Sequence, residues 1–150
     1  MDQQQIEATV TRPAHYAGVT VEPIDVAEHY GFLIGNAIKY LWRAGKKEGA
    51  SEEQDLRKAL FYLERWLTGQ PACELPDYEG FPWESPVEES VRLSAKIVLL
   101  ANENDYISAL FGVSEYSGEE AIFAGINARN VGDLHMQVYN RIKEIEDGKH

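Results

Sequence analysis

The sequence predicts a mainly α-helical protein built on an antiparallel helical hairpin, with further helices and at most a small β element near the N-terminus. Three observations lead to this prediction. Apolar residues recur at steps of three and four along several segments, which is the period of a helix with one buried face. Capping boxes at Ser51 and Ser85 mark helix starts. The connection between the first two periodic stretches is short, so the second helix should double back against the first.

We expect the first helix over residues 26–44, capped by Asp25 and stopped by Gly45. Its apolar positions are Phe32, Leu33, Ala37, Leu41 and Ala44, with Ile34, Ile38 and Trp42 widening the buried stripe. Gly31 and Gly35 lie inside this helix, where each costs about 1 kcal/mol relative to alanine. They should therefore permit a close approach of backbone or ligand.

The second helix is expected over residues 51–68, because Ser51 and Gln54 form a capping box and Gly69 follows the last turn. Its apolar face is made of Leu56, Ala59, Leu60, Leu63, Trp66 and Leu67. This regular stripe and the clear start signal make it a typical amphipathic helix.

Capping signals predict three more helices, over about residues 85–104, 117–129 and 133–145. The third helix should bury Val91, Ala95, Val98 and Leu99, with help from Ile97. Residues 105–116 fit either a further helical turn or short strands.

The chain is expected to divide into a flexible arm (1–13), a helical module (14–69), a proline-rich strap (70–86) and an acidic helical extension packed on the module (87–150). The strap should be pinned across the core by Tyr78, Phe81 and Trp83. An extended segment or strapped loop at the front of the module is indicated by Val19, Val21 and Ile24, broken by Pro23.

Charge is distributed unevenly along the chain. The net charge of −11 argues against general affinity for nucleic acid or anionic lipid. Nevertheless Lys39, Arg43, Lys46 and Lys47 fall within nine residues that contain no acid. Such a cluster indicates a small anion as ligand; the alternative is a solvated basic helix end that complements the helix dipole.

Several classes of protein are excluded by their missing motifs. The sequence has no P-loop, GxGxxG, HExxH, paired CxxC or GxSxG pattern, and its four histidines lack the spacing of a zinc site. No apolar run approaches the roughly 20 residues of a membrane span, and the N-terminus does not have the pattern of a signal peptide. Cys73 is the only cysteine, and we expect a buried structural thiol in a cytoplasmic protein.

Two polar strips point to chemistry. The first helix carries Asn36, Lys39, Tyr40, Arg43 and Lys47 at helical spacing, and the second carries Asp55, Lys58, Tyr62 and Arg65. If both strips face one cleft, the cations can grip phosphate and a Tyr ring can stack on a base. Asp55 would then hold Mg²⁺ or orient a nucleophile. The alternative is that Asp55 serves its helix N-terminus while Lys58 and Arg65 pair with surface acids.

Residues 14–68 also resemble a widespread family of small phage proteins. The shared pattern consists of H-Y, then G-N-x-I-K-Y-x-W-R-x-G-K-K, then D-L-x-K-A-x-x-Y-L-x-R. This family includes the lactococcal phage SaV protein and a coliphage nucleotide monophosphate kinase that lacks a Walker loop. The acidic half that begins near Pro71 matches nothing in the family.

The resemblance implies a site that uses ATP or another nucleotide, with Mg²⁺ at Asp55 as one option. The residues expected to carry the chemistry are Arg43, Lys39, Asp55, Lys58 and His15. Those expected to bind the nucleotide are Asn36, Tyr40, Lys46, Lys47 and Tyr62. In this hypothesis Arg43, Lys39 and Lys46 hold phosphates, and His15 closes over the site or shuttles a proton.

Three functions follow from these observations as hypotheses. The first is a nucleoside or deoxynucleoside monophosphate kinase-like enzyme in the host-cell cytoplasm, self-associating as a homo-oligomer. The second is a non-catalytic phage module that binds a nucleotide or a host protein, as a sensor, sponge or anti-defence factor. The third is an all-α nucleotide pyrophosphohydrolase, although Glu48, Glu52, Glu53 and Asp55 do not form the two separated acidic pairs such an enzyme needs.

Overall fold

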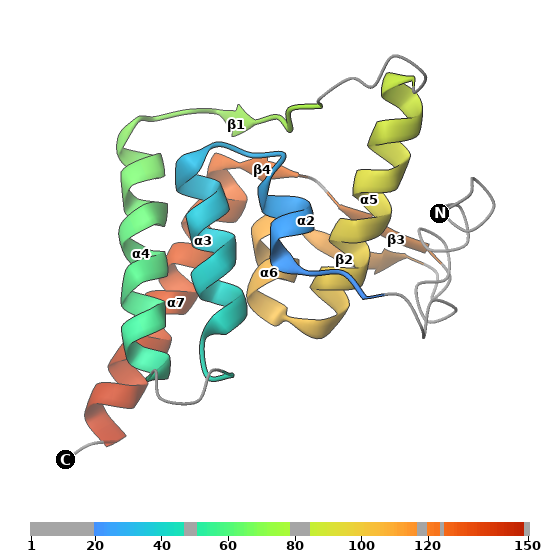
Figure 1. Ribbon diagram of the computed structural model, residues 1–150. Helices are drawn as coiled ribbons and strands as arrows, with labels where there is room; N and C mark the ends of the chain where they lie inside the picture. Colours follow the sequence, from blue (N-terminus) through green and yellow to red (C-terminus); the bar gives the residue numbers. More distant parts are fainter. Residues whose placement is uncertain (1–19, 47–50, 79–84, 117–119, 124, 149–150) are drawn as a thin grey trace.

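The computed structural model describes residues 20–46, 51–78, 85–116, 120–123 and 125–148. The helices in these ranges are α2 (Pro23–Ala27), α3 (Phe32–Arg43), α4 (Glu52–Thr68), α5 (Pro86–Glu103), α6 (Asp105–Phe111) and α7 (Ala128–Gly148) (Figure 1). The strands are β1 (Cys73–Glu74), β2 (Val113–Tyr116), β3 (Glu120–Phe123) and β4 (Ile126–Asn127). The predicted mainly α-helical class is therefore confirmed. No helix of the described ranges has the length and apolar composition needed to cross a membrane.

The β structure lies later in the chain than expected. The strands form two antiparallel pairs, β1 with β4 and β2 with β3. At the front, Ile24 of the predicted extended segment lies in helix α2, whereas Val21 precedes that helix. Pro23 starts this helix because a first-turn residue needs no backbone N–H. Asp25 follows inside the helix, where its carboxylate accepts a bond of 2.9 Å from the Glu22 N–H. The predicted position Val19 lies outside the described residues.

The prediction of a single helix over residues 26–44 is wrong, because the helix is interrupted between the end of α2 at Ala27 and the start of α3 after Gly31. Gly31 is the N-cap of α3, and its N–H donates to the Glu74 carboxylate at 2.8 Å. Gly35 does permit a close backbone approach, since a Cβ there would lie 3.4 Å from the Ala27 carbonyl oxygen. The predicted stop at Gly45 is confirmed, with a φ of 77° that favours glycine.

Helices α3 and α4 form the expected antiparallel hairpin, and α7 packs against α4 (Figure 1). The predicted start and end of α4 are confirmed. Its N-cap Ser51 accepts a bond of 3.0 Å from the Gln54 N–H. Helix α5 also begins as predicted, through the capping box of Ser85 and Glu88.

The C-terminal third differs from the prediction. The ambiguous segment 105–116 forms a helix and then a strand, α6 and β2. The helix predicted over 117–129 is wrong for most of the described residues, because 120–123 form β3 and 126–127 form β4, while 128–129 begin α7. Helix α7 starts at Ala128, ahead of Asp133, because the Asn127 side chain accepts a bond of 2.8 Å from the Asn130 N–H. Strand pairing with β2 and β1 outweighs the local capping signal in this segment.

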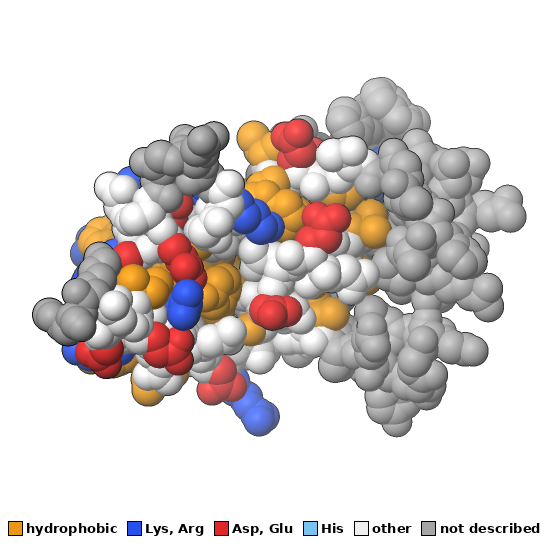
Figure 2. All heavy atoms as spheres, turned by 90° about the horizontal axis from the view of Figure 1, so that it is seen from below, with side chains coloured by type: hydrophobic (Ala, Val, Ile, Leu, Met, Phe, Trp, Pro, Cys, Tyr) orange, Lys and Arg blue, Asp and Glu red, His pale blue; other side chains and the backbone are white. Residues whose placement is uncertain are grey.

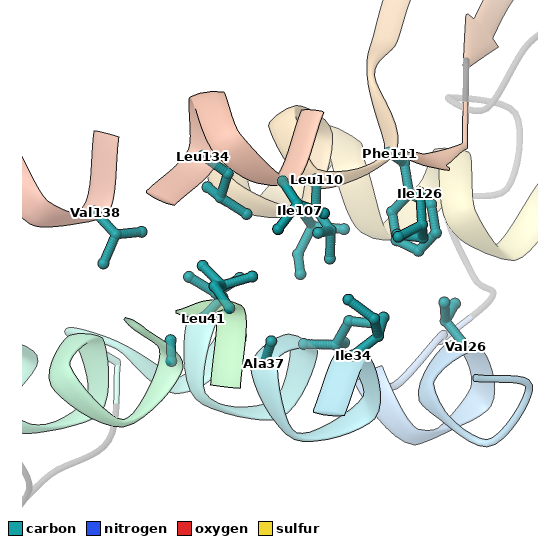
Figure 3. Close-up of a cluster of buried hydrophobic side chains, with 14 of the residues drawn as sticks. Val26, Ile34, Ala37, Leu41, Ile107, Leu110, Phe111, Ile126, Leu134 and Val138 are labelled. Atoms are coloured by element: carbon teal, nitrogen blue, oxygen red, sulfur yellow. The ribbon is translucent and has the colours of Figure 1, made fainter. Parts of the chain in front are cut away.

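One buried apolar cluster joins both halves of the chain. Figure 3 shows side chains of α2 and α3 on one side, among them Val26, Ile34, Ala37 and Leu41, facing those of α6, β4 and α7 on the other. The predicted burial is confirmed for Ile34, Ala37, Ile38 and Leu41, whereas Leu33, Trp42 and Ala44 are half-buried. Phe32 departs furthest from the prediction: it is 72% exposed, because it lies in the first turn beyond the packed part of α3.

The strap after α4 is held by a carboxylate. Glu74 accepts from the Trp66 indole N–H at 3.0 Å and from the Gly31 N–H at 2.8 Å, so it ties the end of α4 to the start of α3. The Asp77 N–H donates to the His29 carbonyl at 2.6 Å. Of the aromatic residues predicted to pin the strap, Tyr78 is exposed, and Phe81 and Trp83 lie outside the described residues. Cys73, predicted to be buried, is exposed.

Asn104 links three helices and supplies a test of this packing. Its Oδ1 accepts from the Tyr106 and Ile107 N–H groups, and its Nδ2 donates to the Leu41 carbonyl at 3.3 Å. Replacement by alanine should lower the free energy of unfolding by about 2 kcal/mol, because the cap of α6 and a buried hydrogen bond are both lost. Urea denaturation measures this change. Asn102→Ala, at an exposed position, is the control and should stay within about 0.5 kcal/mol of the parent; equal effects of the two changes would contradict the assignment.

Candidate functional site

The two polar strips predicted from the sequence meet along the boundary between α3 and α4. Burial of Ile34, Ala37, Ile38 and Leu41 directs one side of α3 into the core and leaves its polar residues along α4. Five of the predicted site residues converge there around one ring. We call this group the Tyr40 cluster; it consists of Lys39, Tyr40, Arg43, Lys58 and Tyr62.

Three cations surround the Tyr40 ring. The Lys39 Nζ lies 5.2 Å from the ring centroid, and the Arg43 Cζ and Lys58 Nζ each lie 5.3 Å from it. The negative face of an aromatic ring attracts a cation at such distances, but three neighbouring cations also repel one another. Among the residues that the structure describes, neither lysine has a carboxylate partner within 4 Å. The cluster therefore carries positive charge that a bound anion would neutralise.

Arg43 is held in place by Asp55. Its Nε and Nη2 lie 3.3 and 3.0 Å from the same carboxylate oxygen, Oδ1. Asp55 is 0% exposed, whereas the Arg43 side chain is 27% exposed and reaches the surface. A buried carboxylate is stable only with a partner, so Asp55 fixes the guanidinium and leaves its outer N–H groups free to meet a ligand.

A magnesium site at Asp55 does not fit this geometry. The carboxylate is buried and Oδ1 is committed to Arg43, although Oδ2 has no hydrogen-bond partner among the described residues. Mg²⁺ requires several ligands in octahedral geometry and retains bound waters. Within the described ranges, no group of three or more His, Cys, Asp or Glu side chains could hold a metal ion. These observations favour a positioning role for Asp55.

Aromatic rings continue from the cluster towards the surface. The Tyr40 and Tyr62 rings are nearly parallel, with centroids 6.0 Å apart. Tyr62 makes edge-to-face contacts with Phe32 at 5.8 Å and with Phe61 at 5.3 Å. Sequence reasoning missed both phenylalanines: it placed Phe32 in the core and did not consider Phe61. The signal was present for Phe61, which precedes Tyr62 and lies outside the buried stripe of α4.

Other predicted site residues lie elsewhere. The Asn36 side chain donates to the Phe32 carbonyl at 2.8 Å, a local bond within α3. Lys46 lies over the Trp42 ring, 3.6 Å from its centroid. Trp42 is two residues from Tyr40 on α3, so the two rings face different directions. His15 and Lys47 lie outside the described residues, so the roles predicted for them stay predictions.

The acids at the start of α4 are engaged in ion pairs. Glu52 binds Arg141 of α7 through two bonds of 2.9 and 3.1 Å. Glu53 binds Arg57 at 2.9 Å, and Arg57 also bonds Glu146. Hydrogen bonds to these carboxylates raise the pKa of both arginines. These pairs tie α4 to α7.

The surface near the cluster is not generally basic. Figure 2 looks from below at the end of the molecule where α3 ends and α4 begins. Among the described residues drawn there, basic side chains are separated by acidic and uncharged ones and form no continuous basic surface. Such a surface suits a small anion better than a long polyanion.

A cavity of about 350 Å³ lies elsewhere, between the strap, α5 and β4. Its lining includes Tyr30, Leu93, Ile97 and Ile126, and it shares no residue with the Tyr40 cluster. Burial raises the pKa of the Tyr30 phenol, and nearby Tyr78 and Glu74 raise it further. The phenol is therefore a neutral hydrogen-bonding group. Among the described residues that line it there is no Lys, Arg or His, so these residues offer no positive charge to a phosphate.

Comparison with known proteins gives matches to phage proteins. Residues 10–64 match a family described as a protein of unknown function (DUF3310). The Gene 1.7 protein of Enterobacteria phage T3 is 38% identical over 78 residues, which cover 46% of this chain and 48% of that protein. The protein named Nucleotide kinase gp1.7 of Escherichia phage T7 is 38% identical over 73 residues, which cover 43% and 37% of the two chains. No solved structure matches the chain.

The chain therefore spans about half or less of the length of these curated relatives. Both are phage proteins, which supports the phage origin that the resemblance implied. All five residues of the Tyr40 cluster, and Asp55 with them, lie inside the segment that matches the family. Residues 10–64 are thus similar to the DUF3310 family, and part of the chain is similar to these proteins of phages T3 and T7, in agreement with the resemblance seen in the sequence.

Proposed function

We propose that the Tyr40 cluster binds the phosphate groups of a nucleotide, and that the protein acts as a nucleoside or deoxynucleoside monophosphate kinase-like enzyme. The observation that carries the proposal is the convergence of Lys39, Arg43 and Lys58 on one ring, with both lysines lacking a described carboxylate partner. The name of the T7 relative, a nucleotide kinase, supports the same reaction.

In this proposal the chain's own residues act mainly by charge and position. Phosphoryl transfer requires neutralisation of the oxygens around the transferred group, and clustered cations can supply that without a P-loop. Arg43 would grip one phosphate with the N–H groups that do not face Asp55, while the two lysines act as point charges. ATP is the donor in this scheme, and Mg²⁺ would be held through the phosphates of the nucleotide.

A second candidate is a non-catalytic module that binds a nucleotide or a host protein. It is favoured by the limited length shared with the relatives and by the unknown function of the matched family. The pyrophosphohydrolase hypothesis gains no support: Glu52 and Glu53 are engaged by arginines, and Glu48 lies outside the described residues.

Incubation with ATP and each deoxynucleoside monophosphate, followed by chromatography of the products, separates these functions. A nucleoside diphosphate formed from one or more acceptors supports the kinase. Calorimetry that detects nucleotide binding without turnover supports the sensor or sponge. A protein that captures a host partner but binds no phosphate ligand would be an adaptor, and the proposal would be wrong.

Removing the lysine charge should weaken nucleotide binding. Lys58→Gln is expected to lower the affinity for ATP about tenfold, since one charge-assisted contact of roughly 1.5 kcal/mol is lost. Calorimetry at low and at high salt measures the effect, which should shrink as salt screens the contact. Lys96→Gln, at a half-buried lysine of α5, is the matched control and should bind ATP like the parent. An unchanged affinity in Lys58→Gln and Lys39→Gln alike would contradict a phosphate site here.

Asp55 should affect stability as well as binding. Asp55→Asn removes the buried charge that faces Arg43, so the free energy of unfolding should fall by about 3 kcal/mol. Lys58→Gln should stay within about 0.5 kcal/mol of the parent, because its side chain has no ion-pair partner in the described structure. Denaturant titrations of both variants measure the difference. A stable Asp55→Asn protein with full ATP affinity would show that Asp55 does not position Arg43.

A further inference from the structure

Two aromatic side chains are exposed at the outer end of the Tyr40 cluster. Phe32 is 72% exposed and Phe61 is 58% exposed, although both are large apolar residues. They come from different helices, α3 and α4, yet both contact the ring of Tyr62. These exposed rings lie near Lys39 and Lys58, which have no carboxylate partner among the described residues, so an apolar and a charged group are available to one ligand.

The contact geometry leaves these rings available for a ligand. Phe32 and Phe61 meet Tyr62 at interplanar angles of 74° and 84°, so each makes an edge-to-face contact. Such a contact covers only part of a phenylalanine side chain, which agrees with the large exposed fractions. Tyr62 in turn stacks parallel to Tyr40, the ring around which the cations gather. Phe32 and Phe61 are therefore connected to the cations through the rings of Tyr62 and Tyr40.

We propose that Phe32 and Phe61 form the base-binding part of the nucleotide site, where a heteroaromatic base stacks while its phosphate contacts Lys39, Arg43 and Lys58. This inference rests on the proposed function, because it takes a nucleotide as the ligand. The proposed ligand is an anion that carries an aromatic ring, because such a ligand can contact both the phenylalanine rings and the cations. In this proposal the two phenylalanine rings bind the flat face of the base, and the cations bind the charged end.

This arrangement predicts a particular kind of specificity. Every base has a π-face, so stacking on phenylalanine adds affinity for purines and pyrimidines alike. The phenylalanine side chains carry no hydrogen-bonding group that would distinguish one base edge from another. The Phe32–Phe61 surface should therefore bind several bases with similar affinity.

A pair of ligands tests the inference directly. AMP and ribose 5-phosphate carry the same sugar and phosphate, but only AMP has a base. The parent protein should bind AMP at least about tenfold more tightly than ribose 5-phosphate, which is the contribution expected of a stacked base. Phe32→Ala and Phe61→Ala should each weaken AMP binding and leave ribose 5-phosphate binding unchanged, whereas Lys58→Gln should weaken both. Phe61→Trp should retain AMP binding. Tyr139→Ala, at an exposed tyrosine of α7, is the aromatic control.

The possible failures are distinguishable. If neither ligand binds the parent, the proposed phosphate site is wrong. If both bind equally well and the alanine variants change neither, the phosphate site stands and the base site is overturned. If the alanine variants weaken both ligands equally, the rings support the fold rather than the base. If sedimentation shows that the alanine variants dissociate an oligomer while AMP binding stays intact, a second copy of the chain covers these rings. The inference is then also wrong.

Discussion

The ion pair between Arg43 and Asp55 joins α3 and α4 near the connection between them. Asp55 is removed from water, and such a carboxylate is stable in the fold only where a cation meets it. The pair therefore fixes how far one helix lies along the other, since sliding either helix would leave a buried charge without its partner. This register places Lys39 and Tyr40 of α3 opposite Lys58 and Tyr62 of α4. The whole Tyr40 cluster depends on that alignment.

The two halves of the chain contribute differently to this surface. The Tyr40 cluster and the exposed Phe32 and Phe61 all come from α3 and α4. The acidic half supplies α6 and α7, which pack against α3 and α4 and complete the core behind them. Arg141 of the acidic half and Arg57 of α4 both form ion pairs with glutamates. Lys39 and Lys58 of the cluster have no such partner among the described residues, in a chain whose net charge is −11.

Much of the candidate site was predictable because helical spacing is a local property. Steps of three and four residues place Lys39 beside Arg43 and Asp55 beside Lys58, whatever the rest of the fold. The short connection also predicted the antiparallel hairpin, but it left open whether the two strips face one cleft. The sequence pattern did not show that Asp55 would be buried against Arg43, or that Lys46 would lie over Trp42. Those outcomes depend on which side of each helix its neighbours cover.

The sequence by itself determined the helices whose ends carry their own signals, namely α4 and α5, because a serine cap and an apolar stripe act within one segment. The tertiary structure decided the break at Gly31, where a carboxylate from residue 74 accepts the backbone N–H. It also decided that residues 120–127 form strands, since their partners lie in β2 and β1. Finally, it decided which aromatic residues of the hairpin are buried and which, like Phe32 and Phe61, are exposed beside the cations. Contacts between segments distant in the sequence leave no periodic pattern in either segment, so only the folded chain reveals them.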